Sequence, residues 1–327
     1  MRRTLRPTSR GAGTVGEVSS VPDGVLQLCH PKWRGVRSSA IAFGDPVLEA
    51  HDLGALVDWL PNITASGAST VVIQGWPPNA GTLAVAASQA GLRVLTVFHS
   101  SPAQHGIDGG EAEAVGEMLD LHTEGVVSAV ATVKAGVARA LHAVGYDVTH
   151  IGNRVPQLDG VVPASVAEGT NVGILLYPMW RKNVTTQILA AHLLRWRPFV
   201  MEDPKVPYLS RNELTICGEL PRDEFLAIQG AMDITFNVTF SECHPMLPME
   251  SYRLGVPCLT SRTSDLFIDD PDLYELTTVD QADNPEAIAH AAQRLLTNKA
   301  EAVVMANASL DATDRKSADQ WRAFTRS

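Results

Sequence analysis

The sequence predicts an α/β protein built from two Rossmann-like domains that face a cleft, and three observations support this. Each half of the chain alternates short apolar runs with helical patterns, which is typical of parallel sheets covered on both faces. The length of 327 residues suits two domains. A segment rich in Pro, Gly and small residues, 157–169, separates the halves and is the expected linker.

The first half, expected to form a domain over 23–156, contains five apolar runs with helical patterns between them. The expected strands are 24–30, 69–75, 93–99, 126–133 and 148–151, and the expected helices are 48–60, 82–90 and 137–144. A tail over 1–22 precedes them and is expected to be flexible because it holds few large apolar residues. The literal G-x-G-x-x-G at 11–16 has no strand before it, so it predicts no dinucleotide site.

The second half, expected over 170–299, repeats the alternation. The expected strands are 171–177, 198–201, 214–217, 233–239, 256–260 and 276–279, and the expected helices are 184–194, 222–229, 247–254 and 285–296. The remaining segment, 300–327, has a helical pattern, and the family resemblance described below implies that this helix crosses back toward the first domain.

Composition narrows the class of protein. The net charge of −10 argues against broad binding to nucleic acid. No apolar run reaches the roughly 18 residues that span a membrane, so no integral membrane segment and a cytoplasmic location are expected. The four cysteines are scattered along the sequence with no metal-type pairing or disulfide framework, which favours reduced thiols. Heavy use of Ala, Val, Asp and Arg suggests a GC-rich bacterial or phage genome.

Two carboxylates, Glu242 and Glu250, stand eight positions apart between an apolar run and a short helical pattern that stops at Gly255. This order of strand, polar loop and helix places both at the carboxyl edge of a sheet, beside a helix N-terminus. Open α/β sheets bind ligands at that edge, and helix N-termini suit anionic groups. Spacing alone favours two solvated glutamates beside a helix start, and the surrounding order of strand, loop and helix is what favours a functional pair.

The segment 241–251 resembles the Glu-x7-Glu signature of retaining, nucleotide-sugar-dependent glycosyltransferases of the GT-B fold, especially family 4. The resemblance implies that Glu242 contacts sugar hydroxyls, that loop amides cradle the sugar and diphosphate, and that Glu250 binds the ribose. The loop residues concerned are Cys243, His244, Met246 and Leu247. This loop is poorer in Gly than the family's usual one, and Pro245 removes a backbone donor.

Cations follow the first expected strand of the second half. The resemblance implies that Lys182, with Arg181 in place of the family's usual Arg, neutralises the departing diphosphate. Cations are disfavoured at a helix start, which favours function over a solvated pair. By the same resemblance, Gly218 and Leu220 flank the nucleotide base, although an ordinary helix start explains them equally well.

The first half carries the expected acceptor side. His99 follows a strong strand, where the family often places a His facing the sugar's reacting carbon, and a structural His at a strand end is the close alternative. Ser100 comes next in the same loop. The segment 32–39 is expected to be a cationic loop containing Lys32, Arg34 and Gly35, which suits an anionic acceptor or plain solvation.

The expected function is transfer of a sugar from a nucleoside diphosphate sugar to an acceptor hydroxyl with retention of configuration. A phage-type DNA glucosyltransferase, a nucleotide-sugar epimerase and a non-catalytic glycosyltransferase-like binding subunit stay open. The acceptor (glycan, lipid, small molecule or modified DNA base) and the oligomeric state are not predicted. No metal and no cofactor are expected, because Asp270-Pro271-Asp272 stands in a setting, 267–271, that has the pattern of a turn, and no convergent oxygen ligands are evident.

Overall fold

The computed structural model describes residues 20–105, 109–156, 158–209 and 213–326. Most of the expected tail, and the G-x-G-x-x-G segment within it, lies outside the described residues. The chain divides into two compact units, which are described separately. Unit 1 comprises Met1–Pro156 with Thr313–Ser327, and unit 2 comprises Gln157–Ala312.

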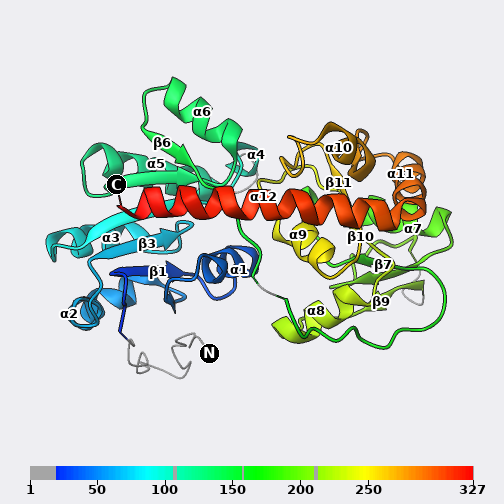
Figure 1. The fold of residues 1–327 in the computed structure, drawn as a ribbon, viewed down its shortest axis with the longest axis horizontal. Coiled ribbons are helices and arrows are strands. Elements are labelled where there is room, and N and C mark those ends of the chain that lie inside the picture. The colour runs from blue at the N-terminus through cyan, green and yellow to red at the C-terminus, as the bar shows by residue number, and fades with distance from the viewer. Residues whose placement is uncertain (1–19, 106–108, 157, 210–212, 327) are drawn as a thin grey trace. The chain divides into compact units, whose positions relative to one another are not determined.

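Unit 1 is a six-stranded sheet in which every pair of neighbours is parallel, as the alternating pattern predicts (Figure 1). In spatial order the strands are β2 (Val47–Glu49), β1 (Val25–Cys29), β3 (Thr70–Gln74), β4 (Arg93–Phe98), β5 (Ala129–Thr132) and β6 (Val148–His150). The helices are α1 (Arg34–Phe43), η1 (Leu53–Trp59), α2 (Leu60–Ala65), α3 (Ala80–Gln89), α4 (Pro102–His105), α5 (Gly109–Thr123) and α6 (Ala135–Ala143).

Two expectations for unit 1 are wrong. The segment 32–39 is not a loop, because α1 begins at Arg34; its buried small residues Ser38, Ser39 and Ala40 let the helix pack closely. The expected helix over 48–60 is instead the end of β2 followed by η1 and the start of α2. The run around Leu48 is short and apolar, and β2 pairs with β1, so tertiary pairing overrides the helical pattern.

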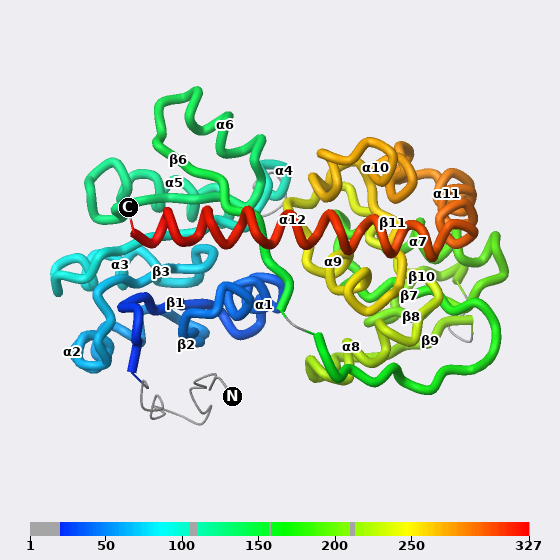
Figure 2. Tube along the Cα trace, viewed as in Figure 1, coloured from blue at the N-terminus to red at the C-terminus, as the bar shows by residue number. Residues whose placement is uncertain are grey.

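Unit 2 is a second six-stranded parallel sheet, and its path can be followed from β7 onward in Figure 2. In spatial order the strands are β12 (Thr278–Val279), β11 (Cys258–Ser261), β10 (Ile234–Asn237), β7 (Asn171–Ile174), β8 (Arg197–Val200) and β9 (Thr215–Ile216). The helices are η2 (Trp180–Lys182), α7 (Val184–Leu193), α8 (Arg222–Gly230), α9 (Met246–Arg253), α10 (Pro271–Thr277), α11 (Pro285–Thr297) and α12 (Lys299–Arg326).

Alternation along β10 shows how the two faces of the unit 2 sheet are covered. Ile234 and Phe236 are wholly buried in the cluster that includes residues of α7 and α11. Thr235 points the other way, and its hydroxyl lies 2.7 Å from the Ser251 hydroxyl of α9. Helices therefore cover both faces of the sheet.

The predicted turn forms at residues 266–269, where the Asp270 N–H donates to the Phe267 carbonyl at 2.9 Å, and a helix begins directly after it. Asp270 caps α10 by accepting a hydrogen bond from the Leu273 N–H at 3.2 Å, and Pro271 occupies the first helical position. Asp is favoured as the cap before a helix and Pro at its first position, and the same residue types also favour turns.

The terminal helix α12 contributes to both units. Within unit 2, Arg253 pairs with Asp311 at 2.8 Å. Within unit 1, the Trp321 indole N–H donates to Asp45 at 2.7 Å, and its ring stacks on Phe43 with centroids 4.3 Å apart.

Candidate functional site

The strand order of unit 2 identifies one place on its carboxyl edge. Counted from β7, the order is 3-2-1-4-5-6, so the winding of the chain reverses between β7 and β10. In doubly wound sheets, ligands bind at the carboxyl ends of the strands at such a reversal. Arg181 and Lys182 follow β7, and Glu242 follows β10. The sequence-predicted residues therefore lie where this topology favours a ligand.

Lys182 and Glu242 form an ion pair in which Lys182 Nζ donates to Glu242 Oε1. Both side chains are largely buried, with 17% and 10% of their surface exposed. An ammonium group carries three N–H donors, and this bond uses one of them. The pair therefore combines a fixed cation with unused hydrogen-bonding capacity.

A buried amide side chain, Gln187 of α7, ties the two segments of this pair together. Its Nε2 donates to the Lys182 carbonyl at 2.8 Å and to the Asn183 carbonyl at 3.2 Å, and its Oε1 accepts from the Val238 N–H at 3.1 Å. Asn183 adds a bond from its own amide to the Val238 carbonyl at 3.2 Å. Sequence reasoning missed Gln187, although a polar residue within an apolar helix is a usable signal for a buried partner.

Arg181 is half-buried beside this pair. Its carbonyl accepts from the Phe240 N–H at 2.8 Å, and the neighbouring Trp180 ring lies 5.3 Å from the Phe240 ring. The backbone on both sides of Lys182 is thus fixed to the segment that leads to Glu242.

Glu250 lies in α9 and is held by Arg222, the first residue of α8. The guanidinium is bidentate, with Nη2 donating to Oε1 at 2.6 Å and Nη1 donating to Oε2 at 3.1 Å. The Glu250 side chain is 3% exposed. Sequence reasoning missed Arg222. The usable signal was a single cation among acidic residues at a helix start, a position where the helix dipole disfavours positive charge.

The loop between the two glutamates differs in part from the expectation. The helix begins at Met246, one residue earlier than predicted, and Pro245 precedes it without a side-chain cap. Cys243 and Met246 are buried. His244 and Leu247 are half-buried, and the Leu247 carbonyl accepts from Gln229 at 2.8 Å.

Gly218 and Leu220 lie between β9 and α8, which begins at Arg222. Gly218 has a φ of +74° and its N–H donates to the Met201 carbonyl at 3.0 Å. No described atom lies within 4 Å of where its Cβ would stand, so this turn favours glycine for its conformation and leaves open space beside it. Leu220 is half-buried.

In unit 1 the winding reverses between β1 and β3. Here the Trp33 ring covers Gly75, which has a φ of +77°; a Cβ at Gly75 would lie 2.5 Å from that ring. The Trp33 ring centroid lies 5.3 Å from that of His30, whose Nδ1 accepts from the Lys32 N–H at 3.2 Å. Burial, followed by His51 and Lys32, lowers the pKa of His30. Lys32 and Gly35 are exposed, and Arg34 is half-buried.

His99 follows β4 on the same edge of the unit 1 sheet and is half-buried, as is Ser100. Its Nε2 lies 2.8 Å from Gln74 Oε1. Burial lowers the pKa of His99 to about 3, so the ring is neutral near pH 7.

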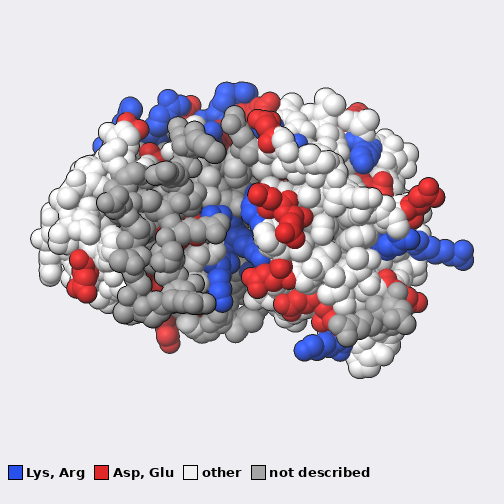
Figure 3. Space-filling model, turned by 90° about the horizontal axis from the view of Figure 1, so that it is seen from below, with Lys and Arg blue, Asp and Glu red and all other residues white. Residues whose placement is uncertain are grey.

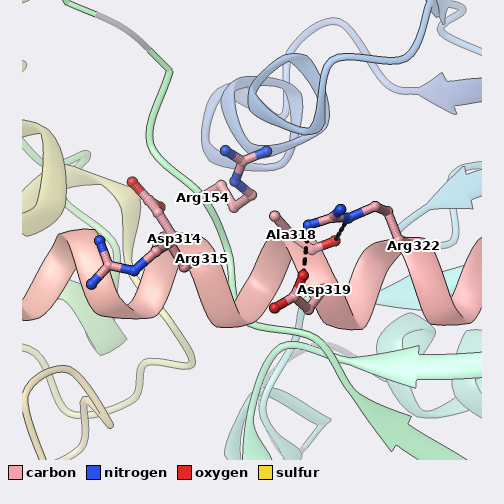
Figure 4. Close-up of a pocket in the computed structure, with 6 residues that line it drawn as sticks. All are labelled: Arg154, Asp314, Arg315, Ala318, Asp319 and Arg322. Carbon is pink, nitrogen blue, oxygen red and sulfur yellow. Dashed lines mark hydrogen bonds and ion pairs between the residues drawn. The ribbon is translucent and has the colours of Figure 1, made fainter.

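A separate pocket of about 280 Å³ lies along α12 within unit 1. Its lining residues are Arg154, Asp314, Arg315, Ala318, Asp319 and Arg322 (Figure 4). The Arg322 guanidinium donates to Asp319 at 2.6 Å, and Arg154 donates to the Ala42 carbonyl at 2.9 Å. Its volume lies below the roughly 300–1,000 Å³ typical of ligand pockets. The guanidinium groups of Arg154 and Arg322 already donate hydrogen bonds within the protein.

Charged side chains are unevenly distributed over the surface. On the face drawn in Figure 3, basic side chains gather in a few groups with acidic side chains beside them. Among the described residues, no three His, Cys, Asp or Glu side chains gather as metal ligands would. Within the same part of the chain, no helix is both long and apolar enough to cross a membrane.

Solved structures resemble this chain over most of its length. HepE of Anabaena, in complex with UDP, is 14% identical, with 91% of this chain and 99% of that chain covered and a TM-score of 0.64. Sucrose-phosphate synthase of Thermosynechococcus elongatus is 15% identical, with 92% and 96% covered and a TM-score of 0.60. The catalytic domain of starch synthase IV of Arabidopsis thaliana, bound to ADP and acarbose, is 15% identical, with 84% and 76% covered and a TM-score of 0.60.

No protein-family model matches the chain, and no curated protein matches it significantly. The structural likenesses, together with two parallel α/β sheets, show that the chain has the GT-B fold of two Rossmann-like domains.

Proposed function

We propose that this protein is a glycosyltransferase that moves a sugar from a nucleoside diphosphate sugar to an acceptor hydroxyl with retention of configuration. The observation that carries the proposal is the Lys182–Glu242 pair at the strand reversal of unit 2. The GT-B fold, and solved relatives whose descriptions include UDP and ADP, support it.

In this proposal Lys182 stabilises the diphosphate as its bond to the sugar breaks. Negative charge develops on the leaving group, and a preorganised cation stabilises it most when water is largely excluded. Lys182 keeps donors for phosphate oxygens while its bond to Glu242 holds the ammonium in place. Arg181 would add charge from the same segment, and the departing diphosphate would accept the acceptor's proton.

Glu242 would orient the sugar through its hydroxyls, and Glu250 would bind the ribose. A carboxylate has about four acceptor positions, and the bidentate contact with Arg222 uses two of them. Arg222 therefore fixes the orientation of Glu250 and leaves acceptor positions for two hydroxyls. The amide groups of the loop 243–247 and the space beside Gly218 would serve the diphosphate and the base.

The first experiment is a thermal-shift panel with UDP, GDP, ADP and TDP, followed by hydrolysis and transfer assays with the matching nucleotide sugars. We expect one nucleotide to raise the melting temperature and its sugar derivative to be turned over slowly in water. Lys182→Ala is expected to abolish most of that turnover.

A non-catalytic binding subunit is the second candidate, favoured by one observation: both glutamates form ion pairs with cations of the protein itself. It predicts that a nucleotide sugar binds and is neither hydrolysed nor transferred. If the protein is folded but shows no thermal shift, hydrolysis or transfer with any member of the panel, both candidates are contradicted.

A further inference from the structure

The two strands that border the reversal of unit 2, β7 and β10, separate before β10 ends. Their pairing register runs only to Gly173 with Thr235, although β10 continues beside β11 as far as Asn237. Directly after β7 the chain turns, and the Leu176 N–H donates to the Ile174 carbonyl at 2.8 Å. On the side of β7, the backbone groups that follow β10 therefore need partners other than a strand.

Two side-chain amides supply those partners. Gln187 Oε1 accepts from the Val238 N–H at 3.1 Å, and Asn183 Nδ2 donates to the Val238 carbonyl at 3.2 Å. Gln187 is 0% exposed and Asn183 is 6% exposed. We call these two side chains the amide wedge. Because both backbone groups of Val238 are bonded to it, the wedge takes over the role of a neighbouring strand at this residue.

The other end of the Gln187 amide bonds to the segment that carries Lys182. Its Nε2 donates to the Lys182 carbonyl at 2.8 Å and to the Asn183 carbonyl at 3.2 Å. Carbonyls only accept hydrogen bonds, so the orientation of this amide is fixed and both of its N–H groups are used. One side chain thus links the backbone of Lys182 to that of Val238, which stands four residues before Glu242.

The reversal of unit 1 is built differently. There the pairing register of β1 with β3 continues to the last residue of each strand, Cys29 with Gln74. The wholly buried side chains of Gln27 and Gln74 bond to each other, with Gln74 Nε2 donating to Gln27 Oε1 at 2.7 Å. These glutamines join two strands that are already paired, whereas the amide wedge links two segments that have separated.

We propose that Gln187 is a positioning residue that sets where the Lys182 ammonium group stands relative to Glu242. It holds the backbone on both sides of this ion pair, and the 2.8 Å bond from the Phe240 N–H to the Arg181 carbonyl joins the same two segments. A cation stabilises a leaving group best at the position where charge develops. The inference rests on the proposed function for the task of Lys182, whereas the wedge itself does not.

Gln187→Met keeps the approximate length of the side chain and removes its hydrogen bonds. With the nucleotide sugar that the wild type hydrolyses fastest, kcat is expected to fall roughly 10–100-fold, since a misplacement of about 1 Å can lower a rate 10²-fold. KM should stay close to wild type, because Glu250 is held by Arg222 instead. An unchanged kcat in a folded Gln187→Met protein would overturn the proposal.

Asn171→Leu is the matched control, at the amino end of the same strand β7. Asn171 is buried; its Nδ2 donates to the Ala167 and Gly169 carbonyls at 3.1 and 3.0 Å, and its Oδ1 accepts from Arg197 at 3.5 Å. The control therefore removes the same kinds of hydrogen bond at the other end of the strand. It should lower the melting temperature, as Gln187→Met does, and keep the wild-type kcat. Equal losses of kcat in both variants would indicate a general structural effect and overturn the positioning role.

Gln187→Glu is the conservative variant that tests the donating half of the amide. An ionised Glu accepts from the Val238 N–H but cannot donate to the Lys182 carbonyl, whereas the protonated acid does both. Burial raises the pKa of a carboxyl group, so the ratio of variant to wild-type kcat is expected to rise between about pH 8 and about pH 6. A ratio as low as that of Gln187→Met at every pH would contradict the role. If Gln187→Met does not fold, a Gln187→Glu ratio that stays low throughout contradicts it equally.

Amide hydrogen exchange tests the wedge without any substrate. In Gln187→Met the Val238 N–H is expected to exchange faster relative to the Phe236 N–H inside β10, because it has lost its acceptor and opens locally. Asn171→Leu should leave that ratio unchanged. An unchanged ratio in Gln187→Met would reject the wedge. Faster exchange at Val238 together with failure of the nucleotide panel would reject the proposed function and retain the wedge.

Discussion

The two strand reversals, one in each sheet, are built from opposite chemistry. In unit 2 the reversal carries a buried ion pair, Lys182–Glu242, with Arg222–Glu250 on the helices that follow. In unit 1 it carries a neutral chain of amides ending at His99, next to a Trp ring packed on glycine. The strand reversal of unit 2 thus carries charged side chains, whereas the amide chain at the reversal of unit 1 is neutral.

Arg222→Ala is expected to have the largest effect, because it leaves the Glu250 carboxylate buried without its partner. Breaking such a pair typically lowers the free energy of unfolding by roughly 3–5 kcal/mol. Chemical denaturation measures this. Arg37→Ala is the matched control in unit 1: it breaks the 2.8 Å pair with buried Glu49 and should destabilise the protein without weakening nucleotide binding. If Arg222→Ala and Arg37→Ala changed nucleotide affinity equally, the nucleotide could not be assigned to unit 2 rather than unit 1.

Lys182→Ala is expected to lower the turnover of the nucleotide sugar by about 10²–10³, the range seen when one preorganised transition-state donor is removed. Initial rates at saturating donor measure it. Lys316→Ala, an exposed lysine of α12, should keep the wild-type rate. A Lys182→Ala rate equal to wild type would remove Lys182 from the site.

Gly75→Ala is expected to be destabilising by roughly 1–3 kcal/mol, because its φ of +77° and the Trp33 ring both oppose a side chain. Gly91→Ala separates these causes: its φ is +82°, but no described atom lies within 4 Å of its Cβ position. Thermal melts should rank Gly75→Ala as the more destabilised. The reverse order would show that Trp33 does not press on this glycine.

The pH dependence of stability should also carry a contribution from His99. Its pKa is about 3 in the folded protein against an ordinary 6.5, so between these values the unfolded chain binds more protons. Stability therefore falls as the pH is lowered from 7 towards 3, and His99→Gln should reduce that slope. Exposed His290→Gln is the control. Denaturation at two pH values checks this, and identical slopes for wild type and His99→Gln would refute it.

The sequence predicted the sheets and the meeting of Lys182 with Glu242 for one reason: both residues follow apolar strands, and strand ends share an edge. It did not predict Arg222 on Glu250, because that contact depends on how α8 and α9 pack. Nor did it predict the Gln27–Gln74 chain, since each glutamine is a single polar residue within a strand and its partner is distant in sequence. The sequence also did not predict α1, because the cationic segment containing Gly35 has the pattern of a loop. Close packing of small residues stabilises that helix.

We infer that the acidic and cationic residues of unit 2 bind a nucleotide. The decisive measurement is calorimetric titration of wild type and Glu250→Gln with the nucleotide that stabilises the protein. Loss of charge-assisted hydrogen bonds worth about 1.5–3 kcal/mol predicts an affinity lower by roughly 10–150-fold, with Arg37→Ala close to wild type. Equal affinities for wild type and Glu250→Gln would contradict the claim.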